Sequence, residues 1–331
     1  KLGGIISDDL LISKEKVELL CSICKVDLVS DIVGEFPELQ GIMGGYFAES
    51  QGFDKEIVLA ISEHYLPLGL TSKVPKKNFS IALALADKLD TLVGFFGINQ
   101  KPTSSKDPYA LRRAALGVVR LLIENDKEFK IKDLINYSIL FYQEQGFEFI
   151  NNATQKELVN FFMDRLRYYM KEKNIRPDII DACMQSFGID KFNKIFKKCI
   201  SLNKVINKEI GNNIILSYKR ASNILENELK NNKFGLNQSV DVELFKNEYE
   251  KNLHNKIYEL RKYFTSFDKD ENYDLSLINL SESKNVIFEF FDNVVVNDED
   301  EIIKKNRLEL LQMLCKTFDN YTNFSNIESI Q

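Results

Sequence analysis

The sequence lacks several residue types on which common kinds of site depend. It has no tryptophan, two histidines and five cysteines in 331 residues. An odd number of cysteines in an acidic chain favours reduced thiols over a disulfide framework, and the close pair Cys21 and Cys24 has no second pair beside it. His64 and His254 lie far apart, so a metal site or a histidine-based triad has little to build on. We therefore expect no metal and no catalytic residue in this chain.

Long apolar runs and phosphate-binding glycine loops are also missing. The longest apolar run, from Ile81 to Ile98, is interrupted by Asp87, Lys88 and Asp90, which leaves no candidate for a membrane-spanning segment. The first residues do not resemble a secretion signal, so we expect a cytoplasmic protein. Neither a Walker loop nor a Rossmann fingerprint occurs, and no cradle for a nucleotide is therefore visible in the sequence.

Proline is absent after residue 177, and helical patterns fill most of the chain. Apolar residues recur at helical spacing in two clear stripes, and no comparable alternating strand pattern is present. Helix starts are predicted at Asp107, as N-cap before Pro108, and at Thr154, which forms a capping-box pattern with Glu157. These patterns predict an all-α fold. The stripes are Val17, Leu20, Cys24 and Leu28, and Phe245, Tyr249, Leu253, Ile257, Leu260 and Phe264.

Charge is unevenly spread along the chain. The 44 Lys and Arg residues oppose 49 Asp and Glu residues, a formal net charge of −5. Basic residues outnumber acidic ones in segments 101–120 and 190–235, whereas segment 241–301 is acidic. Local basic patches on an acidic protein suit limited contacts with a polyanion, although ordinary solvated helix faces would give the same pattern.

The segment 34–46 is unusually rich in glycine for a helical protein. Its Gly41-x-x-Gly44 spacing has the form of a KH-type clamp on a nucleic-acid backbone, but the strands of that fold are missing. A packing loop between helices is the favoured interpretation, because glycine permits tight turns and close approach.

Asp87 and Asp90 lie in an otherwise apolar stretch and therefore need partners. They could bind a metal or act as a general base. They could instead pair with Lys88, Lys106 or the arginines of 112–120 and lock helices together. The pairing is favoured, because the scarcity of histidine speaks against a metal.

Several long strings resemble a known family and occur in the order that the family has. They are Glu35 to Gly44, Glu63 to Pro67, Ala84 to Leu92, Lys101 to Val118, Lys219 to Leu225, Phe290 to Val296 and Asn306 to Leu311. In these strings the chain resembles the β subunit of bacterial-type glycyl-tRNA synthetase. Family members are longer, so the resemblance implies that this sequence corresponds to their C-terminal part.

In that family the enzyme joins glycine to its tRNA with ATP, the α subunit carries the adenylation site and the β subunit holds the tRNA. The resemblance implies the same here: no cofactor in this chain, ATP and Mg²⁺ used by the α subunit, and the α subunit and tRNA-Gly as partners, without membrane or DNA. It implies a degenerate HD-like helical domain at 1–125, a helical linker region at 126–212 and a helical anticodon-binding, DALR-like domain at 213–331.

Phosphohydrolases of the HD fold hold metal with histidines and acids, and Asp27 and Asp87 are the positional counterparts of the acids. Their histidine partners are missing, since Cys24, Lys25 and Val26 precede Asp27. We therefore interpret this part as a non-hydrolytic scaffold. An HD-type nucleotide phosphohydrolase is one alternative, and a docking module for the α subunit without tRNA specificity is another.

The basic stretches and the resemblance together predict tRNA contacts, either to phosphates or, through Tyr218 and Asn223, to bases. Each of these side chains could instead form a contact between helices. Gly45 departs from the family pattern, in which a basic residue is expected before Tyr46. The predicted tRNA-binding residues are Lys101, Lys106, Arg112, Arg113, Arg120, Tyr218, Lys219, Arg220, Asn223, Asn306 and Arg307.

Overall fold

The computed structural model describes residues 1–331 except 150, 152, 187–190, 232–238, 268–271 and 329–331. Within the described residues every regular element is helical and none is a strand, which confirms the predicted all-α class. None of the helices in this part of the chain is both long and apolar enough to cross a membrane. The helices form two compact units, Lys1–Lys173 with Ile189–Asn193, and Asn174–Gly188 with Lys194–Gln331. The three-part division at 125 and 212 stays a prediction.

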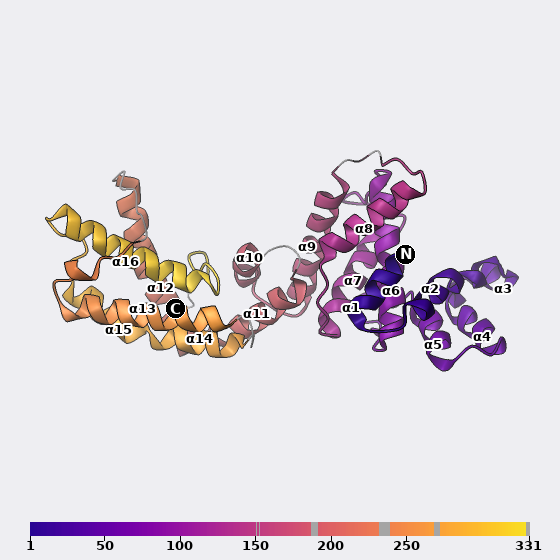
Figure 1. The fold of residues 1–331 in the computed structure, drawn as a ribbon, viewed down its shortest axis with the longest axis horizontal. Helices are drawn as coiled ribbons and strands as arrows, with labels where there is room; N and C mark the ends of the chain where they lie inside the picture. The colour runs from indigo at the N-terminus through magenta and orange to yellow at the C-terminus, as the bar shows by residue number, and fades with distance from the viewer. Residues whose placement is uncertain (150, 152, 187–190, 232–238, 268–271, 329–331) are drawn as a thin grey trace. The chain divides into compact units, whose positions relative to one another are not determined.

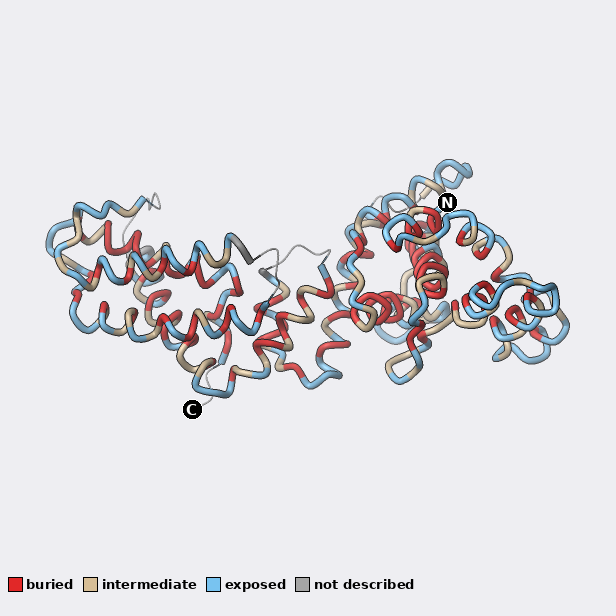
Figure 2. The backbone as a smooth tube through the Cα atoms, turned by 60° about the horizontal axis from the view of Figure 1, so that its bottom comes forward, coloured by how far each residue is buried: buried red, intermediate tan, exposed pale blue. Residues whose placement is uncertain are grey.

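The first unit is built around α6 (Asn78–Gly97), which is the apolar stretch of the sequence. A helix that is apolar on nearly all sides must be covered on all of them. Helix α6 contacts α1, α2, α5, α7, α8 and α9, and buried residues follow one another along it (Figures 1 and 2). Ile81, Leu85, Leu89 and Val93 are fully buried. The apolar run that begins at Ile81 therefore forms the core of this unit.

The other elements of this unit are α-helices and two 3₁₀ turns, and among them α4 packs mainly on α5. They are α1 (Leu2–Leu10), α2 (Lys14–Ile23), η1 (Val26–Val29), α3 (Asp31–Glu35), η2 (Pro37–Leu39), α4 (Ile42–Ser50), α5 (Lys55–Glu63), α7 (Leu111–Glu124), α8 (Ile131–Glu144) and α9 (Thr154–Glu172). Helix α11 (Phe192–Val205) starts in this unit and continues in the second.

The second unit is a helical bundle in which the long helix α12 (Glu209–Asn231) contacts α14, α15 and α16. Aromatic rings fill its interior, where Tyr218, Phe318 and Phe324 lie with ring centroids 5.7–6.2 Å apart. The remaining elements are α10 (Pro177–Ser186), η3 (Val242–Leu244), α13 (Glu248–Phe267), α14 (Tyr273–Glu282), α15 (Lys284–Asn293) and α16 (Glu301–Asp319).

Of the two predicted helix starts, the one at Thr154 is confirmed and the one at Pro108 is wrong. Helix α7 begins at Leu111 rather than at Pro108, and the Asp107 carboxylate accepts hydrogen bonds from the Leu111 and Arg112 amides at 2.8 and 3.0 Å. Helix α9 does begin at Thr154, but that hydroxyl donates to a backbone carbonyl in the preceding turn instead of capping the helix. Asp107 therefore still caps the first amides of α7, whereas Thr154 caps no amide of α9.

Candidate nucleic-acid interface

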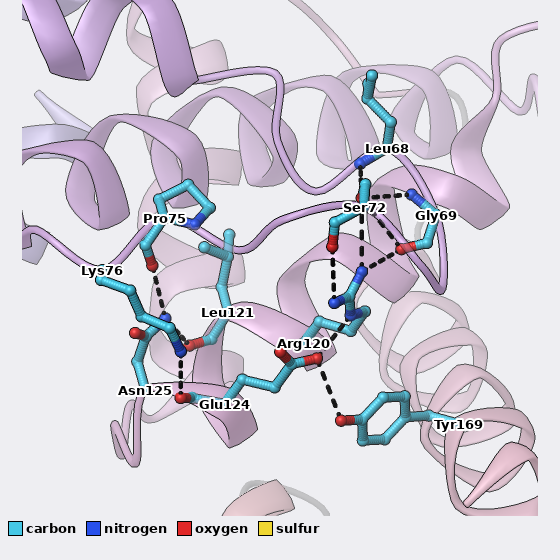
Figure 3. A network of polar contacts seen from close by, with 10 residues as sticks. All are labelled: Leu68, Gly69, Ser72, Pro75, Lys76, Arg120, Leu121, Glu124, Asn125 and Tyr169. Atoms are coloured by element: carbon cyan, nitrogen blue, oxygen red, sulfur yellow. Dashed lines mark hydrogen bonds and ion pairs between the residues drawn. The ribbon is translucent and has the colours of Figure 1, made fainter.

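Arg120, predicted to contact phosphate, has its side chain inside the first unit, where it holds the loop between α5 and α6 (Figure 3). Its Nη2 donates to the Ser72 carbonyl at 2.9 Å and its Nη1 donates to the Gly69 carbonyl. Its Nε lies 2.7 Å from Glu124 Oε1, which also accepts the Tyr169 hydroxyl at 3.2 Å. With these donors engaged, the geometry favours a structural role for Arg120 over contact with RNA.

Two of the remaining cations in residues 101–120 have partners within the protein, and two are exposed without an acidic partner among the described residues. Lys101 Nζ lies 2.7 Å from Glu157 Oε2 at the start of α9, and the Arg112 guanidinium donates to the Thr103 carbonyl in the loop that precedes α7. Lys106 and Arg113 are exposed, and neither side chain has an acidic partner among the described residues. Of the predicted tRNA contacts on α7, Arg113 is at the surface and Arg120 is buried.

Three predicted contacts in the second unit lie in its interior. Arg307 is 5% exposed, with Nε 2.7 Å from Glu250 Oε1 and Nη1 2.6 Å from Asp298 Oδ2. Asn306 is equally buried and forms a pair of hydrogen bonds with the backbone of Asp241 at 2.8 and 2.9 Å. Such paired groups position α16, and the geometry favours this structural role.

Tyr218 is the third of these buried residues. Its hydroxyl donates to Asp319 Oδ1 at 2.9 Å, and its ring packs against Phe318 and Phe324. Burial raises the pKa of Tyr218, and the Asp319 carboxylate adds to that shift. A ring enclosed in this way offers no free face for a base, in contrast to the stacking role predicted for it.

The other predicted residues of α12 do reach the surface. Asn223 is exposed and Lys219 is half-buried, and neither side chain has a hydrogen-bond or ion-pair partner among the described residues. They lie one helical turn apart and therefore on the same face of α12. Arg220 is paired with Asp292 at 3.2 Å, but this pair is exposed and solvent screens it.

Arg220 also stacks on two aromatic rings that the sequence did not single out. Its guanidinium carbon lies 4.7 Å from the centroid of Phe291 and 5.3 Å from that of Phe288, and Lys284 Nζ lies 5.8 Å from the Phe288 centroid. Both rings are only half-buried. We name Lys219, Arg220, Asn223, Lys284, Phe288 and Phe291 the α12–α15 platform. The signal in the sequence was the spacing of Phe288 and Phe291, one turn apart on α15.

Cations next to accessible aromatic faces are the arrangement on which proteins bind unpaired RNA bases. The rings or the guanidinium stack on a base, while amines and guanidinium groups neutralise the neighbouring phosphate. The platform combines both kinds of group with the amide of Asn223, which can form hydrogen bonds to a base edge.

Asp27, one of the two predicted HD-like positions, is fully buried and caps α4. Its Oδ2 accepts the Gly41 amide at 2.6 Å and the Gly44 amide at 3.1 Å. Gly41 has φ of +79°, and a Cβ on Gly44 would lie 2.8 Å from Ile61 Cγ2. The glycines therefore serve a tight turn and a close approach of α4 to Asp27 and α5, as the packing interpretation expects.

Asp87, the other HD-like position, pairs with a residue that the sequence did not suggest. Its Oδ1 lies 2.5 Å from Lys25 Nζ, whereas Lys88, Lys106 and the arginines of 112–120 had been predicted as partners. No three His, Cys, Asp or Glu side chains of the described residues form a group that could hold a metal ion. An ammonium group beside Asp87 repels a cation, so these residues do not fit the metal of a hydrolytic HD site.

The buried amine of Lys88 makes the stability of the first unit depend on pH. Its Nζ donates to the His64 and Tyr65 carbonyls at 3.1 and 3.0 Å, and burial lowers its pKa from 10.5 to about 8. Between these two pH values the unfolded chain binds more protons at this residue, so stability rises with pH. We expect the free energy of urea unfolding to rise more from pH 8 to 10 in the native chain than in Lys88→Met. Parallel pH curves for the two proteins would contradict the assignment.

Gly45, where the family pattern suggests a basic residue, is buried between α4 and α5. A Cβ at this position would lie 1.9 Å from Ser62 Oγ and 3.2 Å from Ser62 Cβ. A longer side chain here requires Ser62 to move, so no basic contact is available at this position in this chain.

The sequence of this chain matches models and members of a known protein family. The family model for the glycyl-tRNA synthetase beta subunit matches residues 1–185, and the model for the DALR anticodon binding domain matches residues 214–331. The glycine–tRNA ligase beta subunit of Rickettsia typhi is 38% identical over 95% of this chain, and that of Rhodospirillum centenum is 37% identical over 95%. The chain spans 45% and 44% of the lengths of these two relatives.

Proposed function

Because the chain belongs to the glycyl-tRNA synthetase β-subunit family, we propose that it binds tRNA-Gly and positions it for glycylation by the α subunit. The second unit contains a DALR anticodon-binding domain. The observation that supports the proposal most directly is the α12–α15 platform, since it lies within residues 214–331. Arg220 and Phe291 are suited to a splayed anticodon base, Asn223 to its hydrogen-bonding edge and Lys219 to the adjacent phosphate.

The mechanism is positional. Contacts to the anticodon by the second unit, and to phosphates by Lys106 and Arg113 of the first unit, restrict where the tRNA can lie. Such restriction raises the effective concentration of the acceptor end at a catalytic site without any bond chemistry in this chain. The proposal assigns ATP and Mg²⁺ to the α subunit, and no residue described above is needed to bind them.

The negative net charge of the chain restricts how it can bind tRNA. A protein with a net charge of −5 must bind tRNA through local patches, because its overall field is repulsive. Affinity should therefore fall with salt in proportion to the few phosphates contacted, while stacking and base contacts persist.

The double substitution Lys219→Ala/Arg220→Ala tests the proposal. We expect it to weaken binding of tRNA-Gly by roughly tenfold and to reduce the slope of log affinity against log salt by about one to two. Binding to a non-cognate tRNA should be weaker at the outset and less affected. The measurement is fluorescence anisotropy with both tRNAs at two salt concentrations. Lys230→Ala is the matched control, since Lys230 is an exposed cation near the end of α12 and outside the platform.

Two results would contradict the proposal. One is equal, salt-sensitive binding of both tRNAs that the double substitution leaves unchanged. The other is binding of the α subunit without binding of tRNA, which would favour the docking alternative instead.

A further inference from the structure

The first unit contains a cavity of about 310 Å³, and Arg113 is the one proposed tRNA contact that lines it. Its walls come from helices α6 and α7, the start of the α5–α6 loop, the end of the α6–α7 loop, and the residues that follow α2 and η2. The lining side chains that matter here are Lys25, Tyr65, Asp87, Lys88, Tyr109 and Arg113. Asp87 lines this cavity, whereas the other HD-like acid, Asp27, is turned to the amides of α4.

The charges that line the cavity favour an anion. The only carboxylate in its wall belongs to Asp87, and Lys25 already neutralises it at 2.5 Å. Lys88 contributes a second amine, held by two backbone carbonyls rather than by an acid. Arg113 is exposed at the cavity and has no acidic partner among the described residues. Its planar fork of donors matches the oxygens of a phosphate group.

The other side of the cavity is aromatic and apolar. The Tyr109 ring is stacked on Phe95 with centroids 4.2 Å apart, so its position is fixed before any ligand binds. Tyr65, Pro67 and Leu68 also line the cavity. A wall of this kind next to the Arg113 guanidinium fits a ligand with a flat ring system at one end and a phosphate at the other.

We propose that this cavity binds a single nucleotide, with its phosphate on Arg113 and its base against Tyr65 and Tyr109. The volume suits one nucleotide, because it lies at the lower end of the range of roughly 300–1,000 Å³ for ligand pockets. We expect binding without hydrolysis, because Asp87 is paired with Lys25 and no group of possible metal ligands occurs among the described residues. A free nucleotide and a nucleotide of an RNA strand share this chemistry, and the site does not depend on the α12–α15 platform.

Isothermal titration calorimetry of the whole chain with AMP, adenosine and inorganic phosphate tests the proposal. AMP is expected to bind saturably with one site per chain, and more tightly than adenosine or phosphate alone. Arg113→Gln should weaken AMP binding at least roughly tenfold, because it removes the phosphate fork and leaves the walls intact. Tyr109→Leu should weaken adenosine and AMP alike. Lys73→Gln is the control, since Lys73 is an exposed cation of the same unit that does not line the cavity.

The outcomes distinguish a free nucleotide from a nucleotide of RNA, and both from a failure of the proposal. Competition between AMP and a short single-stranded RNA would assign the site to a nucleotide of RNA, and AMP binding without such competition would assign it to a free nucleotide. Absence of saturable AMP binding overturns the proposal. Equal AMP affinity in the native chain and in Arg113→Gln, with circular dichroism showing both folded, overturns it as well. Neither result bears on the platform variants, whose failure would be seen with tRNA alone.

Discussion

Replacing Arg307 with leucine is expected to lower the free energy of unfolding of the second unit by about 3–5 kcal/mol. The change removes the guanidinium that lies 2.7 Å from Glu250 and 2.6 Å from Asp298. Glu250 is fully buried, so its carboxylate would lose its only cationic partner in the described residues and remain inside the bundle. Its other oxygen accepts the amides of Lys246 and Asn247, which ties the carboxylate in place ahead of α13.

Urea unfolding followed by far-ultraviolet circular dichroism measures this loss, since the chain has no tryptophan to serve as a fluorescent probe. Hydrogen exchange of the α13 and α16 amides locates the loss in the second unit. Arg307→Lys should retain part of the stability, because an amine can still pair with one carboxylate. Lys230→Ala, which breaks an exposed pair 3.9 Å long, should change stability by less than about 0.5 kcal/mol. A leucine variant as stable as the native chain would refute the structural role of Arg307.

Replacing Asp27 with alanine is expected to cost on the order of 2–3 kcal/mol in the first unit. Two buried amides, those of Gly41 and Gly44, would lose their acceptor at 2.6 and 3.1 Å. The carboxylate also lies at the start of α4, where a negative charge is favoured by the helix dipole. Asp27→Asn should lose less, because a carbonyl oxygen can still accept both amides.

The same variant decides between two interpretations of the HD-like positions. A scaffold role predicts that Asp27→Ala loses stability, as measured by urea unfolding. If Asp27 served only as a metal ligand, the metal-free variant would be as stable as the metal-free native chain. Asp31→Ala is the control, because Asp31 is exposed on the neighbouring helix α3, and its loss should change stability by no more than about 0.5 kcal/mol.

Local sequence patterns identified helices better than they identified helix ends. The apolar stripe around Leu253, Ile257 and Leu260 is buried in α13 as predicted, because helical spacing directly states which face is apolar. The motif at Asp107 is a true local cap, but the chain forms a left-handed turn at Ala110 before the helix begins. Such a turn depends on how the loop packs, which a four-residue motif does not contain.

For the candidate site, the sequence identified the cations but not their surroundings. Lys219, Arg220 and Asn223 are at the surface, yet Arg120 and Arg307 are enclosed. An arginine is equally suited to phosphate and to a buried carboxylate, so its sequence position alone does not separate the two uses. The aromatic half of the α12–α15 platform was missed because Phe288 and Phe291 come from a helix distant in sequence from Arg220.

The sequence by itself determined the helical class and the family, because both depend on information that is local or contained in long strings of residues. Only the tertiary structure decided which charges are available to a partner. A polar side chain is free or engaged according to what other helices place beside it, and those neighbours come from anywhere in the chain. Asp27 shows the difference: its sequence position suggested a lost metal ligand, whereas the amides of α4 that surround it make it a helix cap.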